Sequence, residues 1–280
     1  MYTIRVKPEI LEHRLDCGFY NPKGLAASKK LMSHLPVKPL SALVDQSRTI
    51  TNGVRGPEWA ETNYKMIRLQ DCDDWVVNHE SAASISQRQF EENRRCKLQP
   101  NDVVVAVGGY IGNAAVVVEQ CQAVIGQHSA VLPDPEKSDM DSRFLLAYLN
   151  SRFAEDIFSR YVSGTVQAGI NLQDLRELPA PSPSYQAQKY IGDKVRQAEL
   201  LRTLADSLIS TSKLLVEALI ENQINEGYLI AAQNLLQSGD NNLDRSILAR
   251  LKTDGLDGDG QPLFPDLDAL YALLAQAGHP

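Results

Sequence analysis

VVVAVGGYIGNAAVVV, residues 103–118, places two valine-rich runs on either side of a glycine-rich segment. β-Branched residues favour strands, and glycine permits the positive φ that a tight hairpin turn requires. The stretch therefore predicts a β-hairpin that presents Tyr110 at its tip. The residues leave two interpretations open: a tip that only closes the hairpin, and a tip that contacts a large ligand.

The same glycines do not form a nucleotide-binding motif. A GxGxxG fingerprint that ended at Gly112 would need glycine at position 107, where the chain has Val107. The segment after Gly112 reads as a second strand, whereas pyrophosphate binds at the N-terminus of a helix. The sequence contains no GxxxxGKS/T, HExxH or GxSxG motif, and its five histidines are isolated. We therefore expect a protein that is not an enzyme and needs no cofactor.

Composition predicts a soluble globular protein, because 280 residues with 43% hydrophobic content are enough for a buried core. No stretch approaches the roughly 20 apolar residues that cross a bilayer, and the start has no signal-peptide pattern, so we expect a cytoplasmic location. The acidic loop at 253–262 has Gly255 where a calcium loop needs its first carboxylate, so no metal site is expected. Four cysteines without a CxxC pair predict free, mostly buried thiols: Cys17, Cys72, Cys96 and Cys121.

Charge is distributed unevenly along the chain. The formal net charge is −7, which argues against general affinity for nucleic acid. Residues 21–70, however, contain eight Lys or Arg and three acidic residues, whereas residues 183–280 contain eight basic and 13 acidic residues. The front of the chain is therefore the part that can face an anionic partner.

The pattern up to residue 182 is mixed and predicts an α+β fold. Short β-rich runs at 65–69, 75–78, 103–107, 115–119 and 130–132 alternate with polar turns, and apolar residues recur at helical spacing over 142–160. Pro179, Pro181 and Pro183 then forbid a continuous helix or a central strand. We interpret this segment as a stiff extended linker and as a boundary in the chain.

A long amphipathic helix is predicted after the prolines, over residues 185–226, because proline and turn clusters are absent there. About 40 residues at roughly 1.5 Å each give a length near 60 Å. Two interpretations are open: a helix that lies across its own domain, and a helix that shares its apolar seam with a partner helix. The seam comprises Ile191, Val195, Leu201, Leu204, Leu208, Leu215 and Leu219.

Three segments in order resemble one family, the specificity (S) subunits of type I restriction-modification systems. LQPNDVVVAVGGYIGNAAVV is similar to the family's Gly-Asp hairpin, with Asn101 where the family often has glycine. AVIGQHSAVLPDP with SRFLLAYLNSRF resembles its strand and helix, and SGTVQAGINLQDLRELPAPSPSYQAQKYI resembles the series that enters its long conserved helix. The match covers about residues 30–225.

The resemblance implies a target-recognition domain at 1–182 with a hairpin-rich sheet and a long coiled-coil helix for dimerisation and spacing at 183–238. The small helical tail at 239–280 lies outside the resemblance, and its residues predict a short charged helix at 243–251, the acidic loop and a final amphipathic helix. Full-length S subunits carry two domain-and-helix units, so this chain resembles a half-length form that pairs with a second copy of itself. Such a homodimer would read an inverted-repeat site in double-stranded DNA. The resemblance also implies a DNA adenine methyltransferase (M) subunit, which carries S-adenosylmethionine, and a restriction (R) subunit as partners, and no membrane.

Polar residues of the front segment and of two loops are the expected DNA contacts, because their donors suit phosphates and base edges. Each could equally be an ordinary solvated loop residue. The candidates are Arg48, Thr51, Asn52, Arg55, Lys65, Gly109, Tyr110, Ser163, Thr165 and Gln167. The competing hypothesis is an interaction or scaffold protein that binds no DNA and docks partners through its long helix.

Overall fold

The computed structural model describes residues 7–8, 11–12, 14–164 and 168–253, and side chains only as far as residue 248. Contacts between residues divide the chain into two units, Met1–Arg196 and Gln197–Pro280. Within the described ranges, no helix is both long and apolar enough to cross a membrane.

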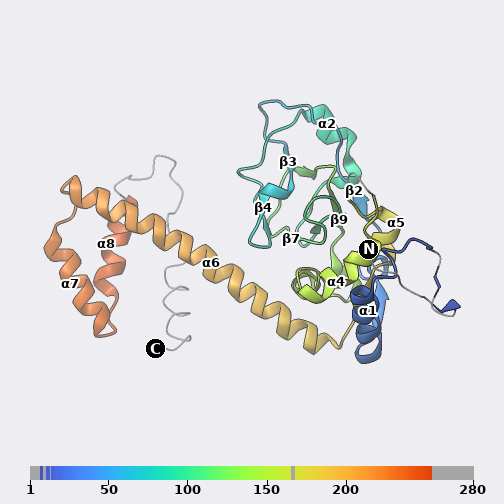
Figure 1. Cartoon of the computed structure of the whole chain (residues 1–280). Coiled ribbons are helices and arrows are strands. Elements are labelled where there is room, and N and C mark those ends of the chain that lie inside the picture. Colours follow the sequence, from blue (N-terminus) through green and yellow to red (C-terminus); the bar gives the residue numbers. More distant parts are fainter. Residues whose placement is uncertain (1–6, 9–10, 13, 165–167, 254–280) are drawn as a thin grey trace. The chain divides into compact units, whose positions relative to one another are not determined.

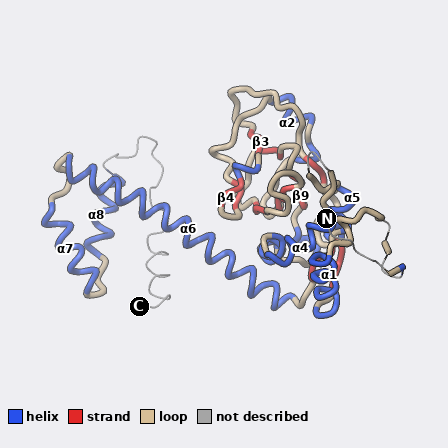
Figure 2. Tube along the Cα trace, viewed as in Figure 1, coloured by secondary structure: helices blue, strands red, loops and turns tan. Residues whose placement is uncertain are grey.

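The centre of the first unit is a six-stranded sheet in the order β2-β9-β6-β7-β5-β4. Figure 2 shows the strands of the chain in red. Strands β6 and β7 are antiparallel, with Val104 opposite Ala115, so the predicted hairpin is confirmed. Most other strand pairs in the sheet are also antiparallel, and only β5 and β7 run parallel. The bounds are β2 (Thr51–Asn52), β4 (Cys72–Asp73), β5 (Val76–Val77), β6 (Val103–Ala106), β7 (Ala114–Val116) and β9 (Ser129–Leu132).

Two hydrophobic cores lie on opposite faces of this sheet, because successive side chains of a strand point in opposite directions. Val103 and Val105 belong to the first core, whereas Val104 and Ala115 belong to the second. The first core includes α1 (Pro22–His34), which packs on α4 (Arg152–Tyr161) as Figure 1 shows, and α3 (Ser142–Leu149). The remaining helices of the unit are α2 (Gln87–Glu92), α5 (Leu172–Glu177) and the short 3-10 turns Leu40–Ala42, Leu69–Asp71, Arg94–Cys96 and Pro135–Ser138.

The proline segment is not a linker, which corrects the prediction. Strand β10 (Pro179–Pro181) pairs antiparallel with β1 (Val37–Pro39), and Ala180 is completely buried. The segment is extended, as its prolines require, and it forms a two-stranded sheet in which proline's missing N–H is tolerated. A second small sheet pairs β3 (Lys65–Ile67) with β8 (Ala123–Ile125) in parallel.

The single helix predicted over 142–160 is interrupted, and the interruption supports the hairpin. Helix α3 ends at Leu149, and the Ser151 side chain caps α4 by accepting from the N–H of Ala154. Between them, the Asn150 side-chain amide bonds both the N–H and the carbonyl of Ala114 in β7, each at 2.9 Å. A continuous helix could not present this amide to the strand edge.

Helix α6 (Tyr185–Ile220) is the predicted long helix, and its 36 residues give a length of about 54 Å. It ends at Ile220 and does not continue to Glu226, because Asn222 adopts a left-handed conformation with φ of 59°. The Asn225 side chain then caps α7 (Glu226–Gln237).

The second unit contains the end of α6, α7 and α8 (Asn242–Thr253), which pack around a small core. Its buried members are Ala218, Ile224, Ala232 and Ile247. Helix α8 confirms the short helix expected near residues 243–251. The predicted acidic loop and the last helix lie outside the described residues.

Candidate nucleic-acid interface

Two adjoining hollows on the first unit share the exposed residues Gln127 and His128. The Arg55 hollow has a volume of about 380 Å³ and is lined by Asn52, Arg55, Val107, Gly108, Gln127, His128, Ala168, Gly169 and Ile170. The Trp59 hollow has a volume of about 550 Å³. Its lining is Val54, Gly56, Pro57, Trp59, Met66, Arg68, Leu69, Gln70, Gly109, Tyr110, Gly126, Gln127, His128 and Ser129.

The loop after β2 reaches the hollows by packing directly on β8. The N–H of Val54 donates to the carbonyl of Ile125 at 2.8 Å. A Cβ on Gly53 would lie 2.0 Å from that same carbonyl oxygen, so only glycine permits this approach. Arg55, two residues further on, is exposed at the rim of its hollow.

The turn that joins β6 to β7 forms part of the wall of the Trp59 hollow. Gly109 and Gly112 have positive φ values of 75° and 94°, and a Cβ on Gly112 would lie 3.2 Å from the Phe158 ring. The turn is therefore packed onto α4, while Tyr110 is 77% exposed. This geometry agrees with the prediction of an outward tip.

A third loop joins the tip through backbone hydrogen bonds. Ser163 and Gly169 exchange two such bonds of 2.9 Å, and the N–H of Ile170 donates to the carbonyl of Val107 at 2.9 Å. Gly108 also forms a β-bridge with Gly169. The second polar loop predicted from the sequence is thus brought against the hairpin.

Neither hollow has a carboxylate among its lining residues. Two other hollows of the described chain are acidic: one contains Asp73 and Asp74, and the other contains four carboxylates. In a chain with a net charge of −7, acid-free walls that carry arginine, histidine and amide groups form a local surface suited to an anion.

The structure places the residues that were predicted to contact DNA at several different sites of the first unit. Asn52 and Arg55 line the Arg55 hollow, Gly109 and Tyr110 line the Trp59 hollow, and Ser163 is exposed beside Gly169. Thr51 lies in β2 and Lys65 in β3, where its ammonium group donates to the Ser84 hydroxyl at 3.2 Å. Thr165 and Gln167 lie outside the described residues.

The Arg48 side chain forms hydrogen bonds within the fold. Its guanidinium donates to both oxygens of Asp102, at 2.6 and 2.9 Å, and to the carbonyl of Lys97 at 2.9 Å. The Asp102 side chain is completely buried. These three bonds hold the guanidinium within the fold, and a role of Arg48 in DNA contact stays an untested prediction.

Four residues that line the Trp59 hollow were not among the predicted DNA contacts: Trp59, Arg68, Gln127 and His128. Trp59 is 53% exposed, and the Arg68 guanidinium lies 5.8 Å from its ring centroid. Arg68 also pairs with the buried carboxylate of Asp71 at 3.2 Å. The sequence did contain one signal for this site: Trp59 stands in a polar, turn-rich segment, where an exposed aromatic side chain is unusual.

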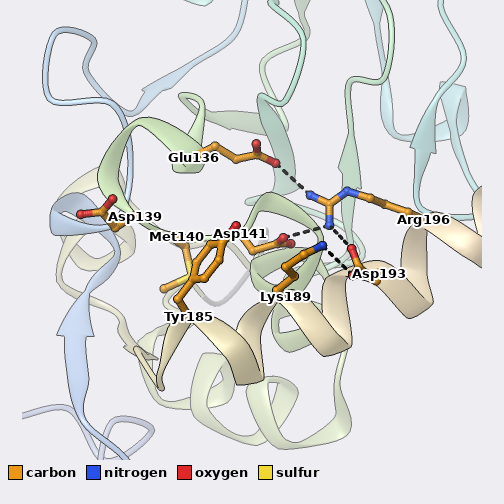
Figure 3. Close-up of a pocket in the computed structure, with 8 residues that line it drawn as sticks. All are labelled: Glu136, Asp139, Met140, Asp141, Tyr185, Lys189, Asp193 and Arg196. Carbon is orange, nitrogen blue, oxygen red and sulfur yellow. Dashed lines mark hydrogen bonds and ion pairs between the residues drawn. The ribbon is translucent and has the colours of Figure 1, made fainter.

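A fourth, polar hollow lies where α6 begins (Figure 3). Arg196 donates to Asp141 at 2.8 Å and to Glu136 at 3.0 Å, and Lys189 pairs with Asp193 at 2.7 Å. Asp141 also caps α3 by accepting from two backbone N–H groups. Because its cations and carboxylates already pair with one another, this cluster attaches the first turns of α6 to the domain.

The residues of the predicted seam are not equivalent. Val195 packs in the first core and Leu215 against the core of the second unit, and Leu204 is buried. Four positions remain partly exposed, between 36% and 49%: Ile191, Leu201, Leu208 and Leu219. Further exposed apolar residues on α6 are Leu200, Ile209, Val216 and Ile220.

Comparisons with known proteins agree on one family. The family model of the type I restriction modification DNA specificity domain matches residues 46–205 of this chain. The type I restriction enzyme EcoBI specificity subunit of Escherichia coli is 27% identical over 229 residues, which are 81% of this chain and 43% of that protein. The chain thus spans less than half the length of this curated relative.

Two solved structures show partial similarity. The HsdS subunit from Thermoanaerobacter tengcongensis matches with a TM-score of 0.42 and 19% identity, over 64% of this chain and 43% of that one. The type I restriction-modification S subunit from M. genitalium matches with a TM-score of 0.35 and 17% identity, over 78% and 50%. On the strength of the family match, which covers more than half of its residues, the chain belongs to the type I restriction modification DNA specificity domain family.

Proposed function

We propose that this chain is a sequence-specific DNA-recognition subunit of a type I restriction-modification complex and that its two acid-free hollows face the duplex. The observation that carries the proposal is the meeting of the loop after β2, the hairpin tip and the loop that ends at Gly169 around walls without a carboxylate. Family membership supports the same role.

Each group on this face has a distinct task in the proposal. Arg55 is exposed and contacts phosphate, which sets affinity and position. The amides of Asn52 and Gln127 read base edges, because an amide can donate to and accept from adenine in the major groove. Tyr110 reaches the groove from the hairpin tip, and Ser163 extends the contact through the neighbouring loop.

The chain supplies recognition and no catalysis in this proposal. Methylation of adenine belongs to a separate M subunit that carries S-adenosylmethionine, and cleavage belongs to an R subunit. The description of the family as a DNA specificity domain supports this division. The site of action would be the cytoplasm, where such a complex meets DNA.

We further propose that two copies pair through α6 and read an inverted repeat with a fixed spacer. Leu201 and Leu208 are seven residues apart and exposed, as are Ile209 and Val216. A seven-residue repeat of apolar side chains is the pattern of a helix that packs along another helix. A two-fold axis would then impose its symmetry on the two half-sites.

Salt dependence of DNA binding tests the first proposal. Each phosphate that the protein neutralises contributes about −0.9 to the slope of log affinity against log salt for duplex DNA. Arg55→Ala should therefore make the slope less steep by about one, whereas Arg95→Ala, at an exposed arginine of another segment, should leave it unchanged. Fluorescence anisotropy with labelled duplex measures both, and a flat salt response of the parent chain would favour the scaffold hypothesis.

Sedimentation velocity tests the dimer. Leu208→Glu should produce monomers, because a charge buried between two helices lacks compensation. Leu208 is 42% exposed in the single chain, so the change should not unfold it. The matched control is Ser210→Glu, the same charge at an exposed polar position of α6. Dimers that persist in Leu208→Glu would place the interface elsewhere.

A further inference from the structure

The Trp59 hollow differs from the Arg55 hollow in its chemistry, although the two share Gln127 and His128. Its walls are mainly apolar and include two exposed aromatic residues, Trp59 at 53% and Tyr110 at 77%. Its volume of about 550 Å³ falls within the range of roughly 300–1,000 Å³ that is usual for small-ligand sites. Readout of paired bases in a groove uses protruding side chains, and it does not require such a concave apolar space.

The loop that carries Trp59 is held rigidly from two sides. The buried Gln89 side chain donates to the carbonyl of Gly56 at 3.0 Å and accepts from the N–H of Glu58 at 2.8 Å. On the other side, Trp59 forms a β-bridge with Ile85. Because the backbone around Trp59 is fixed by these hydrogen bonds, the Trp59 ring is held in its exposed position before a ligand binds.

The charges around the ring suit a partner that is anionic overall. The Arg68 guanidinium lies over Trp59, and Asp71 orients it. Two carboxylates lie nearby in the sequence: Glu58 pairs with Arg88, and Glu61 is exposed, but neither lines the hollow. The polar side chains that line the hollow beside the ring are therefore hydroxyl, amide, imidazole and guanidinium groups. A hydrophobic side chain of a protein partner would need none of these donors, whereas a base attached to a phosphate backbone would use them.

We propose that the Trp59 hollow receives a single nucleobase that has left the base stack, with its flat face against Trp59 and its polar edge toward Gln70, Gln127 and His128. This inference rests on the proposed function, because the Arg55 hollow would position the backbone beside it. Stacking of bases on aromatic side chains is tolerant of sequence, so the hollow binds an unpaired base of any identity and prefers DNA in which a base is already free.

The two tryptophans of the chain provide the test, because Trp75 is also exposed, at 41%, but lies in the acidic hollow with Asp73 and Asp74. That hollow shares Leu69 and Tyr110 with the Trp59 hollow, but Trp59 does not line it. The full-length variant Trp75→Phe leaves Trp59 as the sole reporter, and Trp59→Phe leaves Trp75. Each is titrated with a labelled single-stranded oligonucleotide, a fully paired duplex and the same duplex with one bulged nucleotide. The fluorescence anisotropy of the labelled DNA measures binding. The emission of the remaining tryptophan shows whether the DNA contacts the hollow in which that tryptophan lies.

The expected result is quenching of Trp59 by the single strand and by the bulged duplex, with Trp75 emission unchanged. Trp59→Ala should weaken single-strand binding by about 5- to 150-fold, and Trp75→Ala should not weaken it. Binding by anisotropy without a change in Trp59 emission, or equal quenching of both tryptophans, would overturn the base site and leave DNA recognition intact. Absence of binding to every form of DNA would overturn both proposals.

Discussion

Arg48 and Asp102 form a buried ion pair whose loss should destabilise the first unit. The Asp102 carboxylate accepts four hydrogen bonds: two from Arg48, one from the N–H of Gln99 at 2.9 Å and one from the N–H of Asp134 at 3.0 Å. Arg48→Ala removes the two charged donors and leaves a carboxylate that is completely buried with two backbone donors.

The magnitude follows from this geometry. Removing one partner of a buried ion pair costs about 3–5 kcal/mol, because the remaining charge is uncompensated. The two retained N–H donors and the 19% exposure of the Arg48 side chain place the expected loss at the low end, about 3 kcal/mol. For a unit of this size, such a loss lowers the melting temperature by about 6–12 °C.

Urea unfolding and differential scanning calorimetry of Arg48→Ala measure this loss, and Arg55→Ala is the matched control. Arg55 is exposed, so its removal should change the free energy of unfolding by less than about 0.5 kcal/mol. The two variants should therefore separate: Arg48→Ala loses stability, and Arg55→Ala loses DNA affinity. Parent-like stability of Arg48→Ala together with weakened DNA binding would refute the structural role and restore Arg48 as a DNA contact.

Two further predictions concern the start of α6 and the thiols. A Cβ on Gly192 would lie 2.2 Å from Oδ1 of Asp141, so Gly192→Ala should lower the free energy of unfolding by about 1–3 kcal/mol in urea titrations. The same substitution should cost less in an Asp141→Ala background, which removes the clashing carboxylate. Burial raises the pKa of Cys72 to about 12 and that of Cys121 to about 11, so an alkylating reagent at pH 8 should modify only the exposed Cys17 in the folded chain. Rapid labelling of a second thiol without denaturant would contradict the buried positions.

The local features of this protein were accessible from its sequence. The hairpin at 103–118 depends on valine propensity and on glycines within a few residues of one another, and both strands formed as predicted. The long helix likewise follows from a continuous period of apolar residues. Its end at Ile220 was missed, because the left-handed Asn222 carries no stronger local signal than the polar residues around it.

The remaining features depended on partners far along the chain. Asn150 interrupts a helical pattern because its amide meets β7, 36 residues earlier, and Arg48 is held by Asp102, 54 residues later. The prolines near 180 form a strand only because β1 is available to pair with them. The local sequence sets the conformation that a segment prefers. Burial and hydrogen bonds to distant residues determine which position the segment takes in the fold.

The order of residues alone was enough to predict a basic front segment, a hairpin at 103–118 and a long helix after the prolines. Which side chains share a surface became visible only in the fold, where Trp59, Arg68, Gln127 and His128 line one hollow with Tyr110 and Arg48 is held in an ion pair with Asp102. The physical reason is that a binding face is assembled from loops whose proximity arises from strand pairing across the sheet, and no local pattern of residues encodes that proximity.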